Sequence, residues 1–272
     1  MRYKTVWISD LHLGTRGCDA RRLLDFLRET DFERLYLVGD VIDLWRLKKD
    51  HYWPQEHNDV VQKILRKGRK GAKIVVIPGN HDEFCGNFLG VYGNVTIKTH
   101  DVYTTINGQR LLVVHGHEFD AVTRHARWLA CLGDVGYTFL LGKNRPLNSV
   151  RRRLGLEYWS LSTYAKSKMK NAVKFISRFE DAVVRYAQLY DADGIICGHI
   201  HTPALKQIRD FAYYNLGDWV ESSTALVEHF DGRMELVHWN RSDPTATAAP
   251  VELVFDAADQ SDLLVGGLEL TS

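Results

Sequence analysis

The stretch KTVWISDLH, residues 4–12, is the most informative part of this chain. Residues 4–8 are mostly β-branched or aromatic, which is typical of a buried strand, and an Asp and a His follow at once. Four later stretches repeat this arrangement of an apolar run followed by polar residues. They are LYLV (35–38) before Gly-Asp, KIVVI (73–77) before Pro-Gly-Asn-His-Asp, RLLVV (110–114) before His-Gly-His, and residues 194–197 before Gly-His-Ile-His.

Helical patterns separate the first three of these strands. Apolar residues recur with helical spacing over residues 20–29 and 55–67, and three more strands are expected at 212–216, 224–229 and 235–239. Alternating strands and helices predict an α/β fold, a layered β core flanked by helices. Polar residues massed after strands mark the edge where such folds bind ligands.

The interval between the fourth and fifth strands is far longer than one crossover needs. We therefore predict a core formed by residues 1–117 and 194–240, and a helical cap insertion, 118–193, that covers the mouth of the site. Residues 241–272 are rich in Thr, Ala and Asp and are expected to form a peripheral tail.

The charge is unevenly distributed. The whole chain carries a net charge of +1, whereas residues 143–185 hold eleven Lys or Arg and only three acids, Glu157, Glu180 and Asp181. Such a segment predicts an anionic partner. Residues 128–141, just before it, are apolar and aromatic, and an apolar wall beside a cationic face suits an amphiphile with a phosphate head and acyl chains. A plain helical subdomain with a solvated basic face fits the same composition.

Composition narrows the class of protein. Apolar residues make up 45% and charged residues 25% of the chain, which is ordinary for a soluble globular protein. The four cysteines show no paired spacing, the first residues resemble no secretory signal, and the longest apolar window is too short to span a bilayer. We expect a cytoplasmic protein with reduced thiols. No G-x-x-x-x-G-K-[ST] loop occurs, so a phosphate-loop nucleotide site is excluded.

The polar residues after the strands are those that two neighbouring divalent cations would need. Hydrolysis of a phosphate ester requires an activated water and neutralisation of the phosphoryl charge, and two cations supply both. The candidate ligands are Asp10, His12, Asp40, Asn80, His115, His199 and His201. Alternate residues of an extended chain face the same way, so each D-x-H or H-x-H pair is expected to reach one cavity. His117 offers the same chemistry as His115.

The order D-x-H, G-D-x-x-D, G-N-H-D, H-G-H, G-H-x-H resembles the signature of the calcineurin-like metallophosphoesterase superfamily. The resemblance implies that one metal is held by Asp10, His12, Asp40 and His201. It implies that the second metal is held by Asp40 as a bridge, Asn80, His115 and His199, with His115 preferred to His117. Imidazole and carboxylate ligands suit manganese, with iron or zinc as alternatives.

The same resemblance implies roles for two further residues. His81 would face the substrate as general acid or phosphate binder, and Asp43 would pair with it and fix its tautomer.

A finer resemblance concerns the substrate. The blocks WISDLHLG, GDVIDLW and GHIHTP, with a helical insertion before the last, look like the UDP-2,3-diacylglucosamine pyrophosphatase family of lipid A synthesis. That family carries S-x-x-x-N-x-x-K on a cap helix, and Ser167, Asn171 and Lys174 have this spacing, which puts them on one helical face. One departure is His81, where the dedicated pyrophosphatases have Arg.

This resemblance implies an acylated nucleotide sugar as substrate, UMP as one product, and contact with the inner face of the inner membrane. The alternatives are a broader phosphodiesterase or phosphomonoesterase acting on nucleotides or phosphoproteins, a nuclease, and a non-catalytic scaffold. Nucleic acid is not the expected partner, because the cations lie among apolar neighbours and no stacking platform is evident.

Overall fold

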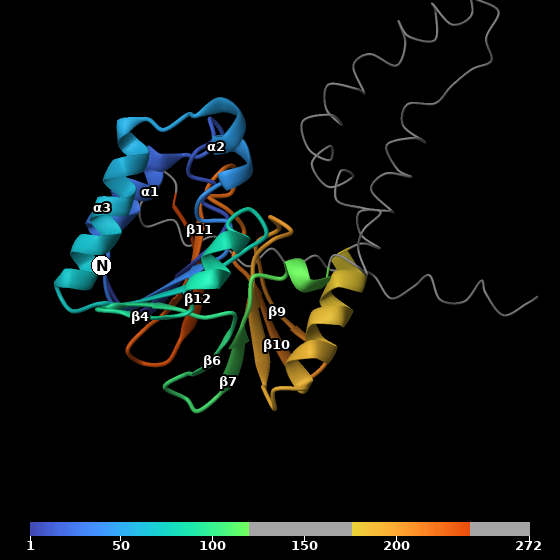
Figure 1. Cartoon of the computed structure of the whole chain (residues 1–272). Helices are drawn as coiled ribbons and strands as arrows, with labels where there is room; N and C mark the ends of the chain where they lie inside the picture. The colour runs from blue at the N-terminus through green and yellow to red at the C-terminus, as the bar shows by residue number, and fades with distance from the viewer. Residues whose placement is uncertain (120–175, 240–272) are drawn as a thin grey trace, which may run out of the picture.

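The computed structural model describes residues 1–119 and 176–239, and within them two β-sheets pack face to face (Figure 1). The first sheet has the strand order β12-β11-β1-β2-β3-β5-β4. Its strands are β1 (Arg2–Ile8), β2 (Asp31–Val38), β3 (Lys73–Ile77), β4 (Gly90–Tyr92), β5 (Val95–Ile97), β11 (Thr224–Glu228) and β12 (Met234–His238). The strands β1, β2, β3 and β5 run parallel.

The second sheet has the order β6-β7-β8-β10-β9. Its strands are β6 (Asp101–Thr104), β7 (Arg110–Val113), β8 (Gly194–Cys197), β9 (Ala204–Ile208) and β10 (Phe211–Asn215). The central strands β7, β8 and β10 are parallel, and the two edge strands pair antiparallel.

Helices cover the outer faces. The helices α1 (Ala20–Glu29) and α3 (Gln55–Arg69) pack on the first sheet, and residues 176–188 form a helix on the second. The shorter α2 (Leu44–Asp50) and the 3-10 helices η1 (Glu83–Phe88) and η2 (His117–Phe119) follow strands of both sheets. No helix in the described ranges has the length and apolarity of a membrane span.

Side-chain alternation along the strands builds three apolar layers. On β1, Val6 and Ile8 face the helices α1 and α3, while Trp7 faces the second sheet and stacks on Tyr36 with ring centroids 5.7 Å apart. The strand β7 divides in the same way, with Leu111 toward the first sheet and Leu112 toward the helix at 176–188. The order of layers is therefore helix, sheet, sheet, helix, which confirms the predicted α/β class.

Most predicted elements are present. All eight predicted strands are present, and for each of them at least one observed end lies within one or two residues of the predicted end. The predicted helices at 20–29 and 55–67 correspond to α1 and α3. The helix α2 and the strands β4, β5, β6 and β9 were not anticipated. Residues 120–175 and 240–272 lie outside the described residues, and with them Ser167, Asn171 and Lys174. Of the predicted insertion, residues 176–188 pack on the second sheet through Phe179, Val183 and Ala187.

Candidate metal centre

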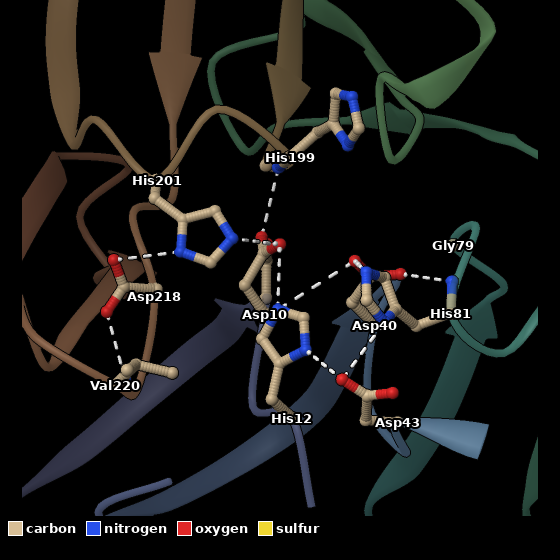
Figure 2. A network of polar contacts seen from close by, with 12 residues as sticks. Asp10, His12, Asp40, Asp43, Gly79, His81, His199, His201, Asp218 and Val220 are labelled. Carbon is tan, nitrogen blue, oxygen red and sulfur yellow. Dashed lines mark hydrogen bonds and ion pairs between the residues drawn. The ribbon is translucent and has the colours of Figure 1, made fainter. Parts of the chain in front are cut away.

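The predicted ligands gather where the parallel strands end. The strands β1, β2 and β3 of one sheet, and β7 and β8 of the other, present their carboxyl ends at the same edge of the two-sheet core (Figure 2). The residues directly after each strand therefore converge, although they come from segments up to nearly two hundred positions apart. This is the edge at which α/β folds bind ligands.

The backbone at these ligands is left-handed. The φ angles of Asp10, His12, Asp40, His199 and His201 are 53°, 49°, 52°, 71° and 54°. A non-glycine residue in this region costs about 1–3 kcal/mol, and such residues cluster where function demands a special geometry. The expectation that Asp10-x-His12 and His199-x-His201 lie on extended backbone is wrong, because β1 ends at Ile8 and β8 at Cys197. Both pairs still share a cavity, because both members of each pair turn in the same left-handed way.

Hydrogen bonds between loops hold this backbone in place. The amide of Asp10 donates to the Gly39 carbonyl at 3.1 Å and that of His12 to the Asp40 carbonyl at 2.9 Å. The amide of Trp219 donates to the Asp10 carbonyl at 3.1 Å. The strained loop is thus locked by two other segments, which is the condition under which strain persists.

Two glycines admit the close approach of these loops. A Cβ at Gly39 would collide with the imidazole of His115, and a Cβ at Gly198 would collide with Ser9 Oγ and stand 2.5 Å from Asp10 Oδ2. Gly39 also has φ +74°, whereas Gly198 is required only for space.

The first cluster contains Asp10, His12 and His201, whose ligand atoms all lie within 4.8 Å of one another. Asp10 Oδ1 is 3.2 Å from His201 Nε2 and 3.9 Å from His12 Nε2. On its other side the His201 ring presents Nδ1 to Asp218 Oδ2 at 3.3 Å (Figure 2). A carboxylate in this position fixes the tautomer of a metal-binding imidazole and raises its basicity.

The second cluster contains Asp40, His115 and His199, again within 4.8 Å. His115 Nε2 is 3.5 Å from Asp40 Oδ1, and its Nδ1 lies 3.0 Å from the Val38 carbonyl. Here a backbone carbonyl takes the place of the carboxylate as the group that orients the imidazole. All three residues are buried.

Asp40 lies between the two clusters. Its Oδ2 is 3.8 Å from His12 Nε2, and its Oδ1 is the oxygen that faces His115. Ligand atoms held 2.0–2.2 Å from one ion are about 3–4 Å apart. One oxygen toward each cluster is the arrangement that a bridging carboxylate needs.

The side chain of Asn80 gives an independent test of whether a metal fits. Asn80 is 8% exposed, and neither its Oδ1 nor its Nδ2 has a hydrogen-bond partner among the described residues. A buried amide left without partners is costly, and an ion is one of the few explanations for it. A donor set of carboxylate, imidazole and amide oxygen matches divalent manganese, iron or zinc, so the residues present fit the group.

The carboxylates of the site favour a cation. Burial opposes ionisation of Asp10, but the nearby His201 and His115 outweigh it and hold the pKa of Asp10 far below its usual range. Burial also opposes ionisation of Asp40, and a hydrogen bond with His115 holds its pKa low as well. Both side chains are therefore charged at neutral pH.

The imidazoles respond in the opposite direction. Burial disfavours the charged forms of His201 and His115. The neighbouring carboxylates prevail and raise the pKa of His201 to about 11 and that of His115 to about 9. In the absence of metal these rings are therefore protonated at neutral pH, and metal binding must displace protons from the nitrogens that ligate it.

The two predicted catalytic residues lie together beside the clusters. His81 Nδ1 is 3.0 Å from Asp43 Oδ2, as predicted for the pair, and its Nε2 is 3.8 Å from Asp40 Oδ2. Asp43 Oδ2 also lies 3.3 Å from His12 Nδ1, a second partner that was not anticipated. Asp43 Oδ1 accepts a hydrogen bond from the Arg46 amide at 2.8 Å and so caps α2. Trp45, from the first turn of that helix, covers the His81 ring with centroids 4.3 Å apart.

His117 does not belong to either cluster. Its ring centroid is 5.6 Å from that of His115, and its Nδ1 is 3.7 Å from Glu118 Oε2. Among the described residues it joins no group of side chains that could hold an ion. The geometry therefore favours His115 over His117.

Two supporting carboxylates were missed. Asp82 accepts the amides of Gly79 at 2.6 Å and of Val41 at 2.7 Å, so it ties the loop after β2 to the loop after β3. Asp218 accepts the Val220 and Glu221 amides through Oδ1 while its Oδ2 faces His201. Both signals were present, since Asp82 ends the G-N-H-D block and Asp218 follows the strand at 212–216.

The sequence of the chain is similar to those of known phosphoesterases. The family model described as calcineurin-like phosphoesterase matches residues 3–203. This range contains every residue of both clusters. The UDP-2,3-diacylglucosamine hydrolase of Ectopseudomonas mendocina (strain ymp) is 28% identical over 237 residues, which cover 80% of this chain and 91% of that protein.

A protein of the same name from Pseudomonas savastanoi pv. phaseolicola is 29% identical and covers 78% of this chain and 86% of its own length. Among solved structures, the phosphoesterase Yfce of E. coli aligns with a TM-score of 0.39 and 16% identity, over 87% of this chain and 99% of that one.

The match to the family spans more than half of the chain and includes all five motif blocks. A pair of side-chain clusters joined by one carboxylate is the site that such an enzyme uses to hydrolyse phosphate esters and anhydrides with divalent metals. The chain therefore belongs to the calcineurin-like phosphoesterase family and is a metal-dependent hydrolase of the dinuclear type.

Proposed function

We propose that this enzyme hydrolyses the pyrophosphate bond of UDP-2,3-diacylglucosamine or a closely related lipid-linked nucleotide sugar, and that it releases UMP and the acylated sugar 1-phosphate. The observation that carries the proposal is the similarity to hydrolases named for this substrate, which extends over most of both chains. The dimetal chemistry of the family supplies the reaction type.

We propose manganese as the working metal, with iron or zinc as alternatives that the same ligands accept. Two divalent cations supply the Lewis acidity that makes water nucleophilic at neutral pH and offsets charge on the phosphoryl oxygens. Asp10, His12 and His201 would hold one ion and Asn80, His115 and His199 the other, with Asp40 shared.

We propose that His81 donates a proton to the leaving oxygen. Its Nδ1 faces Asp43 at 3.0 Å, which leaves Nε2 directed toward the clusters. Asp43 would hold the ring in the tautomer and orientation needed for that transfer. A histidine here, instead of the arginine of the dedicated pyrophosphatases, favours one second candidate: a broader phosphodiesterase or phosphomonoesterase that acts on nucleotides or phosphoproteins.

A substrate panel separates the two. With the purified enzyme and excess Mn²⁺, we expect UDP-2,3-diacylglucosamine to be cleaved with a much higher kcat/KM than bis-p-nitrophenyl phosphate or a phosphopeptide. The reverse order would replace the proposed substrate by the broader activity. Equal loss of every activity after EDTA treatment, with recovery on addition of Mn²⁺, is the control that all turnover comes from the metal site.

The proposed substrate also suggests a location. We propose that the enzyme works in the cytoplasm and meets its lipid at the inner face of the inner membrane, where the cationic segment 143–185 would contact anionic headgroups. Co-sedimentation with vesicles that contain phosphatidylglycerol, weakened by added salt, is the expected result. Equal binding to neutral phosphatidylcholine vesicles would contradict it.

A further inference from the structure

A second concave region borders the metal centre and belongs to neither cluster. It is a cavity of about 650 Å³, within the range of about 300–1,000 Å³ that small-molecule sites occupy. Its lining comes from the loop after β3, from η1 and η2, from residues 99–100 and from the helix at 176–188.

The cavity and the metal centre share a wall. Gly79 lines the cavity, and a Cβ placed there would stand 2.5 Å from the Asp40 amide nitrogen and 2.8 Å from His115 Cδ2. His117 lines it from the other side, with its ring 5.6 Å from that of His115. A substrate whose phosphorus lies at the metal centre would therefore extend one of its two halves into this cavity.

The lining combines flat aromatic surface with hydrogen-bonding groups. Phe84 lines the cavity with its side chain 61% exposed, so its ring is accessible to a ligand, and Tyr186 also lines the cavity. The polar lining is Glu83, Asn87, Thr99, His100, His117 and Glu118. Glu118 is already engaged through the Gly116 amide, at 3.0 Å, whereas Glu83 has no hydrogen bond or ion pair recorded among the described residues.

This lining discriminates between the parts of a lipid-linked nucleotide sugar. An acyl chain would desolvate the carboxylates of Glu83 and Glu118 without adding a hydrogen-bond donor for either, which is unfavourable. A phosphate would meet the same carboxylates as like charges, so it belongs at the metals instead. A nucleoside fits both features, because its base can stack on an aromatic ring and its ribose hydroxyls can donate to a carboxylate.

We infer that this cavity binds the nucleoside half of the substrate, with Phe84 as the stacking surface for the base and Glu83 as the acceptor for the ribose diol. The inference rests on the proposed function in taking the substrate to be a nucleoside diphosphate derivative. It adds the place of the nucleoside, and it leaves the acylated half to extend from the other side of the metal centre.

The test measures inhibition by UMP and by ribose 5-phosphate, using the full-length Mn²⁺-loaded enzyme with bis-p-nitrophenyl phosphate as reporter substrate. UMP should inhibit at a concentration about tenfold lower than ribose 5-phosphate, which is the advantage expected from one stacked base. In the Phe84→Ala variant the two inhibitors should become nearly equal, and Phe84→Tyr should restore the difference. The ratio is taken within each variant, so a change in its own turnover does not affect it.

Phe88→Ala is the matched control. Phe88 lies in the same 3-10 helix, is 48% exposed and contacts the Phe84 ring at 5.2 Å, but it does not line the cavity. It should keep the tenfold preference and a normal basal rate. Glu83→Gln should narrow the gap between UMP and its 2′,3′-dideoxy analogue, while Phe88→Ala should not.

The inference is overturned if UMP is no better an inhibitor than ribose 5-phosphate, or if Phe84→Ala and Phe88→Ala lower the preference equally. These outcomes differ from failure of the proposed substrate, because the assay contains no acylated compound. An enzyme that prefers UMP through Phe84 but leaves UDP-2,3-diacylglucosamine intact would retain the nucleoside site and lose the lipid substrate. An enzyme that cleaves that lipid but shows no preference for UMP would retain the lipid substrate and lose the nucleoside site.

Discussion

The two clusters of the metal centre are supported in different ways. In the first, the imidazoles of His201 and His12 are each backed by a carboxylate, Asp218 and Asp43, at 3.3 Å. In the second, His115 is backed by the Val38 carbonyl at 3.0 Å and its side chain is fully buried, whereas the side chain of His201 is 39% exposed.

The contrast suggests a division of labour. A carboxylate partner makes an imidazole a more basic ligand. Burial lowers the pKa of both rings, but Asp10, helped by Asp218, raises the pKa of His201 to about 11, whereas Asp10 and Asp40 raise that of His115 to about 9. The Val38 carbonyl carries less negative charge than a carboxylate, but it is part of the backbone and its position is fixed by the sheet. The first cluster is thus supported by carboxylate side chains and the second by a backbone carbonyl, and Asp40 directs one oxygen toward each of them.

The largest expected effect is that of Asp40→Ala. Among residues 1–119 and 176–239, Asp40 is the carboxylate with one oxygen toward each cluster, so both ions should be lost and turnover should fall to background. Metal content by mass spectrometry and hydrolysis of bis-p-nitrophenyl phosphate check this, with Asp231→Ala at an exposed position as control. Retention of one full equivalent of metal would show that the clusters are independent.

The second effect concerns His81, which is proposed as the general acid and belongs to neither predicted set of metal ligands. His81→Ala should slow kcat by about 10²–10⁴, the usual contribution of a general acid, and should leave the metal content unchanged. Asp43→Asn should lower kcat and also weaken metal binding, because Asp43 faces both His81 and His12. Metal loss in His81→Ala comparable with that in Asp40→Ala would make His81 a ligand instead.

The third prediction tests the difference between the clusters directly. Asp218→Asn keeps an oxygen for the amides of residues 220–222 but removes the charge that faces His201. It should weaken one Mn²⁺ site by about 10–100-fold and leave the other unchanged. Equilibrium dialysis with a two-site fit measures this, and Asp191→Asn, whose side chain is 94% exposed, is the control. Equal weakening of both sites would mean that the clusters share their support.

The ends of these five strands were predictable because the candidate ligands follow each strand within a few residues. An apolar run followed by Asp, Asn or His is visible at all five, and the family pattern orders them, so the seven ligands could be chosen before the fold was known. Elements without such a local signal were missed. The helix α2 has seven residues and buries none of them, and β4 and β5 have three residues each, too few for a period to appear.

Two features of the site depend on distant contacts, and the sequence could not reveal them. The left-handed backbone at Asp10 is held by carbonyl and amide groups of Gly39 and Trp219, which lie 29 and 209 positions away. The pairing of Asp218 with His201 requires β10 to return beside β8. The ligand side chains do converge, but not because they alternate along an extended strand. Hydrogen bonds from distant segments hold the backbone of these residues in the left-handed conformation, which overrides their local preference for an extended one.

The smallest expected effect belongs to Trp45, which contacts the site without any polar interaction with it. The centroid of its indole lies 4.3 Å from that of the His81 ring, with the ring planes at 34°, and Trp45 is 52% exposed, so it covers the imidazole from the solvent side. An aromatic pair contributes about 0.5–1.5 kcal/mol, and the lower half of this range is expected for a half-exposed pair. Trp45→Ala should therefore lower kcat about two- to fivefold with KM for a small chromogenic ester unchanged, and Trp45→Phe should recover most of the rate.

Trp53→Ala provides the matched comparison, because Trp53 packs edge-on against His57 at 5.6 Å, is 38% exposed and contacts no residue of the site. It should leave kcat unchanged. If Trp45→Ala raised KM and left kcat as it was, the indole would act on substrate binding instead of on His81. In that case Asp43 alone would orient the His81 ring, as Asp218 orients that of His201. The imidazoles of His12, His81 and His201 would then each depend on a carboxylate for their orientation.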